Sequence, residues 1–254
     1  MNSNFDLDKY IMHHVVNSNE WLLPFVGPIA LPGILSNHAL MLCLASTIIL
    51  LLFLVFYRKN ERVPTGLTNF LETLVVFVRD EVAIPNLGEN DGLQFTPILC
   101  TIFFFILTLN LMGLIPLFST ATSNINVTFS LGFLIFILLT FGTIARNGFK
   151  GVWHALIPST LPKWLIPFFL VVELASIVVR SVALMIRLFA NMIAGHMVIL
   201  SFLGLLILFG WIALPALFVA ICVYCLEVFI ALLQAYIFIL LSAVFIGQMY
   251  HPEH

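Results

Sequence analysis

The stretch that decides the fold runs from Pro167 to Phe209 and reads PFFLVVELASIVVRSVALMIRLFANMIAGHMVILSFLGLLILF. Apart from a glutamate, two arginines and a histidine, it is almost entirely apolar. A helix that crosses a bilayer takes about 20 apolar residues, so this stretch predicts a helix embedded in lipid. As one continuous helix it would exceed a hydrocarbon core of about 30 Å. The helix is therefore strongly tilted or broken, and hydropathy alone does not decide between the two.

The composition extends this prediction to the whole chain. Hydrophobic residues make up 62% of the 254 positions and charged residues 9%, which excludes an ordinary soluble domain. Short alternating strands, the signature of a membrane barrel, are absent, so we expect an all-α membrane protein. The net charge of -2 gives no indication of nucleic acid as a partner. The four cysteines lie in apolar segments, so no disulfide framework, metal site or cofactor is expected.

Apolar runs divide the chain into about five membrane-embedded helices plus one interfacial amphipathic helix, within a single membrane domain over 1–254. A cleaved signal peptide is not expected, because the N-terminal segment lacks a basic start followed by an unbroken apolar run. The second long apolar stretch follows a turn near Gly210 to Pro215 and forms a tilted hairpin with the first. The expected segments are an N-terminal non-cytoplasmic segment (1–36), a first span (37–57), the interfacial helix (65–84), a helical hairpin (94–144) and the long tilted hairpin (167–250).

Basic residues outside the spans fall on one side of the membrane if the chain crosses as described. They are Arg58, Lys59, Arg62, Arg79, Arg146, Lys150 and Lys163. The positive-inside rule makes this side cytoplasmic or matrix. The N-terminus then lies outside and the C-terminus, His254, lies inside.

Ionisable residues within lipid cost several kcal/mol each, so each one in an apolar run is a functional candidate. Glu173, Arg180 and Arg187 follow each other at heptad spacing, which places them on one helix face with a drift of about 20° per step. Asn191 lies one turn beyond Arg187 on the same side. Glu173 and Arg180 are explained equally well as charges near the interface whose side chains snorkel to water. Arg187 keeps its charge at any working pH and needs a carboxylate partner.

A second group of polar residues indicates proton transfer. Glu227 and Gln234 are seven residues apart and share a face of the last helix, while His196 points away from Arg187. In an antiparallel hairpin Glu227 can approach His196, and an acid beside an imidazole passes protons near neutral pH. A structural histidine and a salt bridge from Glu227 to an arginine remain alternatives. His38 and His154 stand at segment ends, where interfacial hydrogen bonding explains them.

Three motifs resemble the F-type ATP synthase subunit a family. The most specific is RLFANMIAGH, from Arg187 to His196. The second joins Glu227 to Gln234 within LLQAYIF, and the third combines NLMGLIP, which begins at Asn110, with NINVT, which contains Asn126. Together with matching order and length, the resemblance covers nearly the whole chain and is weakest over the first 35 residues.

The resemblance implies roles for these residues. Arg187 would be the essential arginine facing the carboxylates of a rotating c-ring, with Asn191 and Gln234 as polar neighbours. His196 and Glu227 match the proton-channel pair, although some members of the family carry the acid first and the histidine second. The possible supporting polar residues are Glu173, Arg180, Asn110 and Asn126.

The resemblance also implies a setting for the chain. Expected partners are the c-subunit ring, peripheral stalk b subunits, membrane lipids and, through the complex, the soluble ATPase head. The chain would translocate protons by two offset half channels in a bacterial inner membrane and would catalyse nothing alone. The alternatives are a secondary ion transporter with a buried Arg/Glu/His relay, disfavoured by the lack of internal repeats, and a membrane scaffold. The sequence does not decide between proton and sodium coupling.

Overall fold

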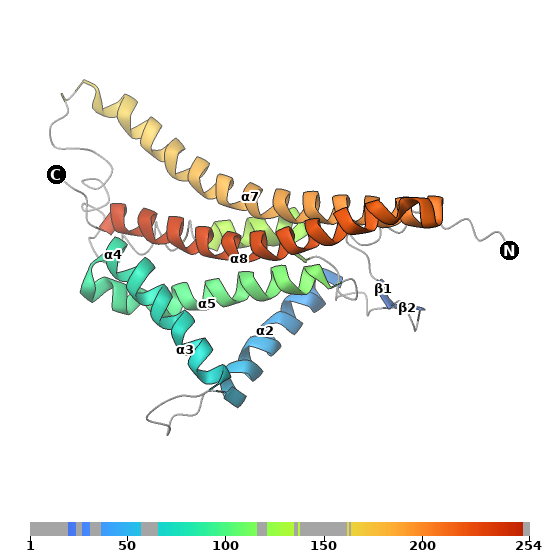
Figure 1. Cartoon of the computed structure of the whole chain (residues 1–254). Coiled ribbons are helices and arrows are strands. Elements are labelled where there is room, and N and C mark those ends of the chain that lie inside the picture. Colours follow the sequence, from blue (N-terminus) through green and yellow to red (C-terminus); the bar gives the residue numbers. More distant parts are fainter. Residues whose placement is uncertain are drawn as a thin grey trace. The chain divides into compact units, whose positions relative to one another are not determined.

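Helices dominate the part of the chain described by the computed structural model, which is residues 20–23, 27–30, 37–56, 66–115, 121–134, 137, 162 and 164–250 (Figure 1). The long helices are α2 (Asn37–Phe56), α5 (Glu89–Leu114), α7 (Ile166–Phe209) and α8 (Leu214–Tyr250). Shorter pieces connect them: α3 (Leu67–Phe77), the π-helical turn η1 (Val78–Ala83), α4 (Ile84–Leu87), and the 3-10 turns η2 (Ala121–Ser123) and η3 (Gly210–Ala213).

Within the described part of the chain, four helices are long and apolar enough to cross a membrane, namely Asn37–Val55, Glu89–Leu114, Ile166–Leu206 and Leu214–Gln248. A shorter apolar helix, Ile125–Leu134, lies at the start of the second arm of the predicted hairpin (94–144). The remainder of that arm lies largely outside the described residues. These elements confirm an all-α, multi-pass membrane protein. The first arm of this hairpin is predicted to begin at Gln94, but its helix already begins at Glu89.

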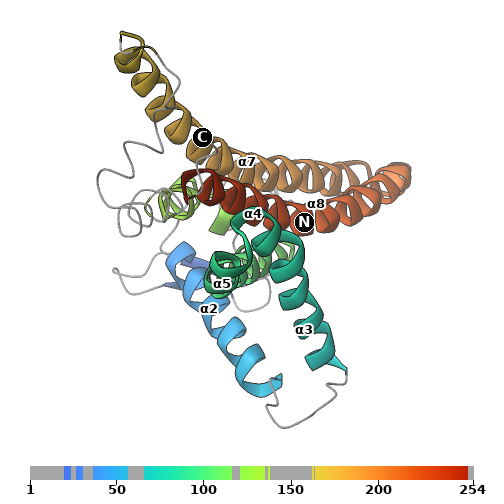
Figure 2. The same cartoon turned by 90° about the vertical axis from the view of Figure 1, so that its left-hand side faces the viewer.

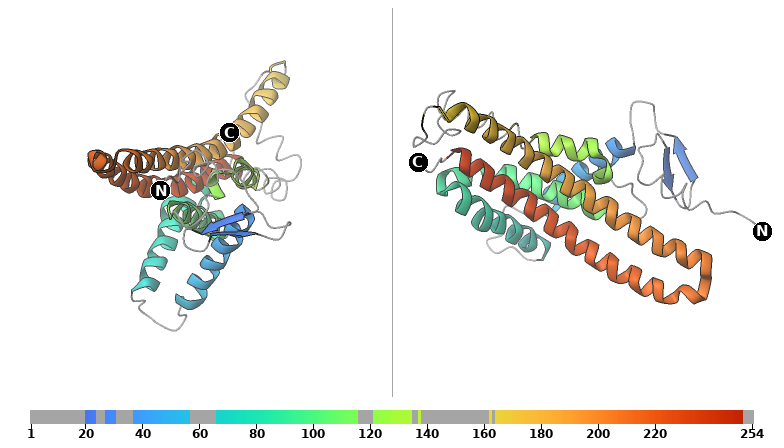
Figure 3. Two further views of the ribbon diagram at one scale, coloured as in Figure 1. Left: turned by 90° about the vertical axis from the view of Figure 1, so that its right-hand side faces the viewer. Right: turned by 90° about the horizontal axis from the view of Figure 1, so that it is seen from above.

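The structure decides between a broken and a continuous helix in the long apolar stretch. Helix α7 has 44 residues, which is about 66 Å at 1.5 Å per residue, and α8 has 37 residues. Both are continuous, so steep tilt remains the way to keep them in a bilayer. The chain reverses between them at η3, where Gly210 adopts a φ of 58° that suits glycine (Figure 3). The predicted turn near 210–215 is therefore present.

The predicted interfacial helix over 65–84 is divided into three pieces. Figure 2 shows α3 leading into α4, and the π-helical turn η1 lies between them. Helix α3 exposes Leu67 and Phe70 and buries Leu71. At the end of the segment, α8 passes close to α4, because a Cβ on Gly247 would collide with the backbone carbonyl of Asn86. The position of the segment 65–84 at the membrane interface remains a prediction.

A small β-hairpin precedes α2, and the sequence reading assigned no secondary structure there. Strands β1 (Glu20–Leu23) and β2 (Gly27–Ala30) pair antiparallel, with Glu20 opposite Ala30 and Leu23 opposite Gly27 (Figure 3). Each strand has four residues, and β2 contains a proline. Strands this short give no readable alternation of apolar and polar residues.

Contacts within the chain define two compact units. The first unit comprises 1–50, 105–128 and 186–234, and the second comprises 51–104, 129–185 and 235–254. In the first unit, α2, α5 and η2 share a core of Met41, Ala45, Leu109, Met112 and Ala121. In the second, aromatic pairs join its helices: Phe53 with Phe104, Phe77 with Tyr236, and Phe95 with Tyr250. The single membrane domain remains a prediction.

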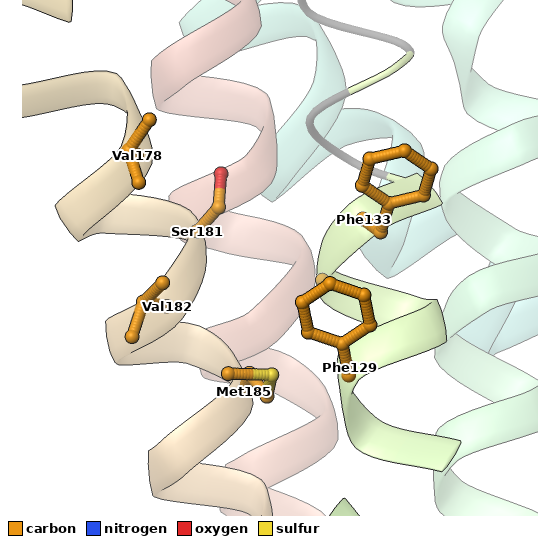
Figure 4. A pocket seen from close by; sticks show the side chains of 7 residues that line it. Phe129, Phe133, Val178, Ser181, Val182 and Met185 are labelled. Atoms are coloured by element: carbon orange, nitrogen blue, oxygen red, sulfur yellow. The ribbon is translucent and has the colours of Figure 1, made fainter. Parts of the chain in front are cut away.

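The second unit also contains an apolar cavity of about 200 Å³. Figure 4 shows Phe129 and Phe133 on one side of it and Val178 and Met185 of α7 on the other. The two rings are nearly parallel, with centroids 5.9 Å apart. The two helices approach closely beside the cavity, since a Cβ on Gly132 would lie 3.2 Å from a backbone oxygen of α7.

The basic residues behind the predicted orientation are mostly outside the described part of the chain: Arg58, Lys59, Arg62, Arg146, Lys150 and Lys163. The one that is described, Arg79 in η1, pairs with its neighbour Asp80, with 2.7 Å between Nε and Oδ1. The hydrogen bond from Arg79 holds the pKa of Asp80 below its ordinary value. The orientation remains a prediction.

Candidate functional site

Arg187 lies on the outer surface of α7, and its side chain is exposed. Ala183, Ala190 and Ala194 are exposed one or two turns away on the same face, so the arginine is flanked by small side chains. Among the residues that the structure describes, Arg187 makes no hydrogen bond or ion pair. A fixed cation in an apolar helix needs a partner, and small neighbours allow another helix to approach it closely.

Arg180, seven residues earlier on α7, has a different environment. Its Nη1 donates a hydrogen bond to Oε1 of Gln248 on α8 at 2.8 Å. Its guanidinium carbon also lies 5.1 Å from the ring centroid of Phe245, within the range of a cation–π contact. Glu173, a further seven residues back, is half-buried. Equal spacing on one helix therefore gives the two arginines unequal surroundings.

Asn191 and Gln234 connect α7 to α8 one turn beyond Arg187. Nδ2 of Asn191 donates a hydrogen bond to Oε1 of Gln234 at 3.0 Å. The Gln234 side chain is 3% exposed, and its Nε2 has no partner within the described part of the chain. An amide pair of this kind fixes the relative position of two helices and leaves a donor available to water.

Glu227 is buried on α8, with 4% of its surface exposed, and its carboxyl lies against the backbone of Gly195 on α7. A Cβ at Gly195 would lie 2.6 Å from the carboxyl carbon of Glu227. Only glycine leaves room for this approach. The backbone of His196 belongs to α7, but its side chain is outside the described residues, so the acid and imidazole pair remains a prediction.

Asn110 brings α5 to the same site. Its Nδ2 donates to the carbonyl oxygen of Ala231 at 3.4 Å, and its side chain is 1% exposed. Glu227, Ala231 and Gln234 are all buried and lie four and three residues apart, so they share one face of α8. Asn110 therefore contacts α8 at Ala231, which lies between the acid and the amide in the sequence. The other candidate from the hairpin, Asn126, is exposed, and its backbone N–H bonds to the side chain of Asn124.

His38 is a buried residue that the sequence reading assigned to interfacial hydrogen bonding. Its side chain is 2% exposed, and neither ring nitrogen has a hydrogen-bond partner among the residues described. The ring is thus buried among other helices, which position at the end of an apolar run does not reveal, and its interfacial hydrogen bonding remains a prediction. Only the packing of α2 on α5 reveals the burial.

The arrangement combines an outward-facing cation with an interior polar site, all within the first unit. The interior site contains one ionisable acid, Glu227, and three amides, those of Asn110, Asn191 and Gln234. A carboxyl group can take up and release a proton, whereas the amides only orient water and the acid. An ionisable acid among amides can take part in proton transfer.

The family model described as ATP synthase A chain matches residues 39–247. ATP synthase subunit a of Anaeromyxobacter dehalogenans strain 2CP-C is 44% identical over 217 residues, covering 84% of this chain and 57% of that protein. The Myxococcus xanthus protein of the same name is 39% identical (87% and 76% covered), and that of Chloroherpeton thalassium is 40% identical (96% and 77% covered). The chain thus spans a little over half the length of the Anaeromyxobacter relative. On these matches and its membrane helices, the chain belongs to the ATP synthase A chain family.

Proposed function

We propose that the chain is the stator subunit a of an ATP synthase membrane sector, and that it couples proton flow to ATP synthesis. In this role it forms two offset proton half channels against a rotating c-ring and catalyses nothing alone. The observation that carries the proposal is the contrast around Arg187. Arg187 is exposed on α7 and has no partner among the described residues. It lies one turn from the part-buried contact of Asn191 with Gln234, and two turns from Gly195 beside Glu227.

Arg187 acts on a carboxylate supplied by the ring. A nearby fixed positive charge favours the ionised form of a carboxyl group and lowers its pKa, so a protonated ring carboxyl that reaches Arg187 releases its proton. The guanidinium itself stays protonated, whereas a desolvated lysine could lose its charge. The same charge repels a hydrated proton and prevents leakage between the two half channels. Each proton crossing 100 mV makes about 2.3 kcal/mol available for rotation.

Glu227 carries protons on the inner side of the α7–α8 pair. Its burial beside Gly195, with Asn110 between it and Gln234, gives a polar site inside an otherwise apolar bundle. The acid accepts a proton from water and passes it towards the ring, and His196 is its proposed partner. Glu173 is a possible further polar residue, while Arg180 anchors α7 to α8 through Gln248.

The partners follow from the same proposal. They are the c-subunit ring, the peripheral stalk b subunits, membrane lipids and, through the complex, the soluble head. We place the chain in a bacterial inner membrane with its N-terminus outside and its C-terminus in the cytoplasm. The support for the membrane itself is the set of four long apolar helices.

The test compares two arginine removals in the assembled complex. Arg187→Ala should abolish ATP synthesis driven by an imposed proton gradient in membrane vesicles and should raise the passive proton leak. Arg187→Lys should restore little of the rate, because a lysine in this place can deprotonate. Arg180→Ala is the matched control, and it should keep most of the rate because Arg180 has partners within the chain.

Two results would contradict the proposal. Gradient-driven ATP synthesis by Arg187→Ala would remove the arginine from the mechanism. Proton transport by the purified chain alone in liposomes, without a ring, would instead favour the secondary transporter.

A further inference from the structure

Three buried polar side chains lie at the start of α2 and in the turn η2. Asn37 is 4% exposed, His38 is 2% exposed and Thr122 is fully buried. In the described part of the chain, Oδ1 of Asn37, both ring nitrogens of His38 and Oγ1 of Thr122 have no hydrogen-bond partner. A buried polar atom without a partner costs about 1–3 kcal/mol. Proteins normally satisfy such atoms with ordered water.

These side chains belong to one packed region of the first unit. Met41, Leu109 and Ala121 share a core cluster. His38 lies one turn before Met41 on α2, Thr122 follows Ala121, and Asn110 follows Leu109. The start of α2, η2 and the end of α5 therefore meet, and each contributes an unsatisfied polar atom to the same region.

The unsatisfied atoms continue towards α8. Asn110 donates through Nδ2 to Ala231, but its Oδ1 has no partner among the described residues. Nε2 of Gln234, on the face of α8 that carries Ala231, also has no hydrogen-bond partner among the described residues. Each of these atoms is a site for an ordered water.

We propose that ordered waters at these atoms connect His38 to Glu227, and that His38 is a proton-relay residue at the outer end of this path. The inference rests on the proposed function and adds a residue to its proton entry side. One ring nitrogen accepts a proton from water while the other releases its proton to the next water. The ring then turns over, so that an unprotonated nitrogen again faces the incoming proton. Asn37, Asn110 and Thr122 orient the waters and keep their own protons. No oxidant or further reactant is required.

The experiment uses the complete complex in membrane vesicles and measures ATP-driven proton pumping. His38→Ala should lower the rate by at least about tenfold, as expected for the loss of a proton-transfer group. Imidazole added to the medium should restore part of the rate. His38→Gln should stay slow, because an amide forms hydrogen bonds but does not relay protons. Met41→Leu, one turn along α2, is the packing control and should keep the normal rate.

Two results would overturn the inference. The first is a normal rate for His38→Gln, and the second is a slow His38→Ala complex that imidazole does not accelerate. If the His38 variants fail to assemble, Thr122→Val decides, since it removes one water ligand and keeps the imidazole. It should lower the rate about threefold, and a normal rate would overturn the inference.

Glu227→Gln, measured alongside, separates this inference from the proposed function. If Glu227→Gln blocks pumping while His38→Gln is normal, only the relay at His38 is wrong. If both variants pump normally, the proton-carrying role proposed for Glu227 fails as well, while the role of Arg187 is tested separately by Arg187→Ala.

Discussion

Polar groups on α7 and α8 have different surroundings in the two units. In the second unit Arg180 bonds to Gln248 and lies over Phe245, and the buried hydroxyl of Ser242 bonds to the preceding turn of its own helix. In the first unit Arg187 has no partner within the described chain, and Gln234 retains a free donor. Arg180 and Ser242 therefore bond within the second unit, whereas Arg187 and the Gln234 donor of the first unit remain available to water and to a partner. Such groups are costly in a membrane protein and persist where function requires them.

The largest expected effect tests the contact of Gly195 with Glu227. A side chain at Gly195 would overlap the Glu227 carboxyl, so Gly195→Val must displace the acid or separate α7 from α8. Overpacking of this kind costs about 1–3 kcal/mol even where neighbours can shift. We expect ATP-driven proton pumping in vesicles to fall to the background level.

Shortening the acid at position 227 should compensate for a side chain added at position 195. The added Cβ of Gly195→Ala would lie 2.6 Å from the carboxyl carbon of Glu227 and 3.1 Å from its Cγ. Glu227→Asp removes one methylene and should restore part of the rate in the Gly195→Ala background. A normal rate for Gly195→Ala alone would show that the acid does not need this space.

The second prediction concerns the amide pair of the first unit. Asn191→Ala and Gln234→Ala each break a 3.0 Å hydrogen bond between α7 and α8. Loss of a partner in a buried site costs about 1–3 kcal/mol, which corresponds to a rate lowered by roughly tenfold. The double variant should be no slower than the slower single variant, because both remove the same contact. Effects that multiply in pumping assays would mean that the two side chains act separately.

The sequence predicted the features that depend on local apolar pattern. An arginine in an apolar run identified Arg187, and the run from Pro167 identified a long helix embedded in lipid. Periodicity also placed Arg180 on the same face as Arg187. It could not distinguish them, because the partner of Arg180 is Gln248, 68 residues away. The spacing of residues along one helix gives no information about partners that are distant in the sequence.

Contacts between helices account for most of what the sequence reading missed. The hydrogen bond from Asn110 to Ala231 joins residues 121 positions apart. The space at Gly195 has meaning only once Glu227 lies against it. The burial of His38 likewise depends on α5 and η2, which cover the start of α2. The short strands β1 and β2 and the π-helical turn η1 have patterns too brief to read.

The third prediction tests whether Arg180 stabilises the second unit. Arg180→Ala removes a hydrogen bond and a cation–π contact, which together are worth about 1–2 kcal/mol. The purified complex should therefore melt at a lower temperature while it keeps most of its proton pumping. Arg187→Ala should do the reverse, with little change in melting and no pumping. Equal thermal destabilisation by both substitutions would remove the distinction between the two arginines.

The smallest effect is expected at the exposed ion pair of η1. Arg79 and Asp80 are adjacent in sequence and bond through two contacts of 2.7 and 3.1 Å, with about 40% of each side chain exposed. The hydrogen bond from Arg79 lowers the pKa of Asp80, so its contribution is present above the pKa of the unfolded chain and disappears as the pH falls through the lower folded value. At neutral pH the contribution is complete. It is also small, because water screens exposed pairs and adjacent residues can still pair in the unfolded chain. Asp80→Asn should therefore leave the melting temperature at pH 7 unchanged, unlike Arg180→Ala. A clear decrease in the assembled complex would contradict this and would place a partner subunit against Asp80.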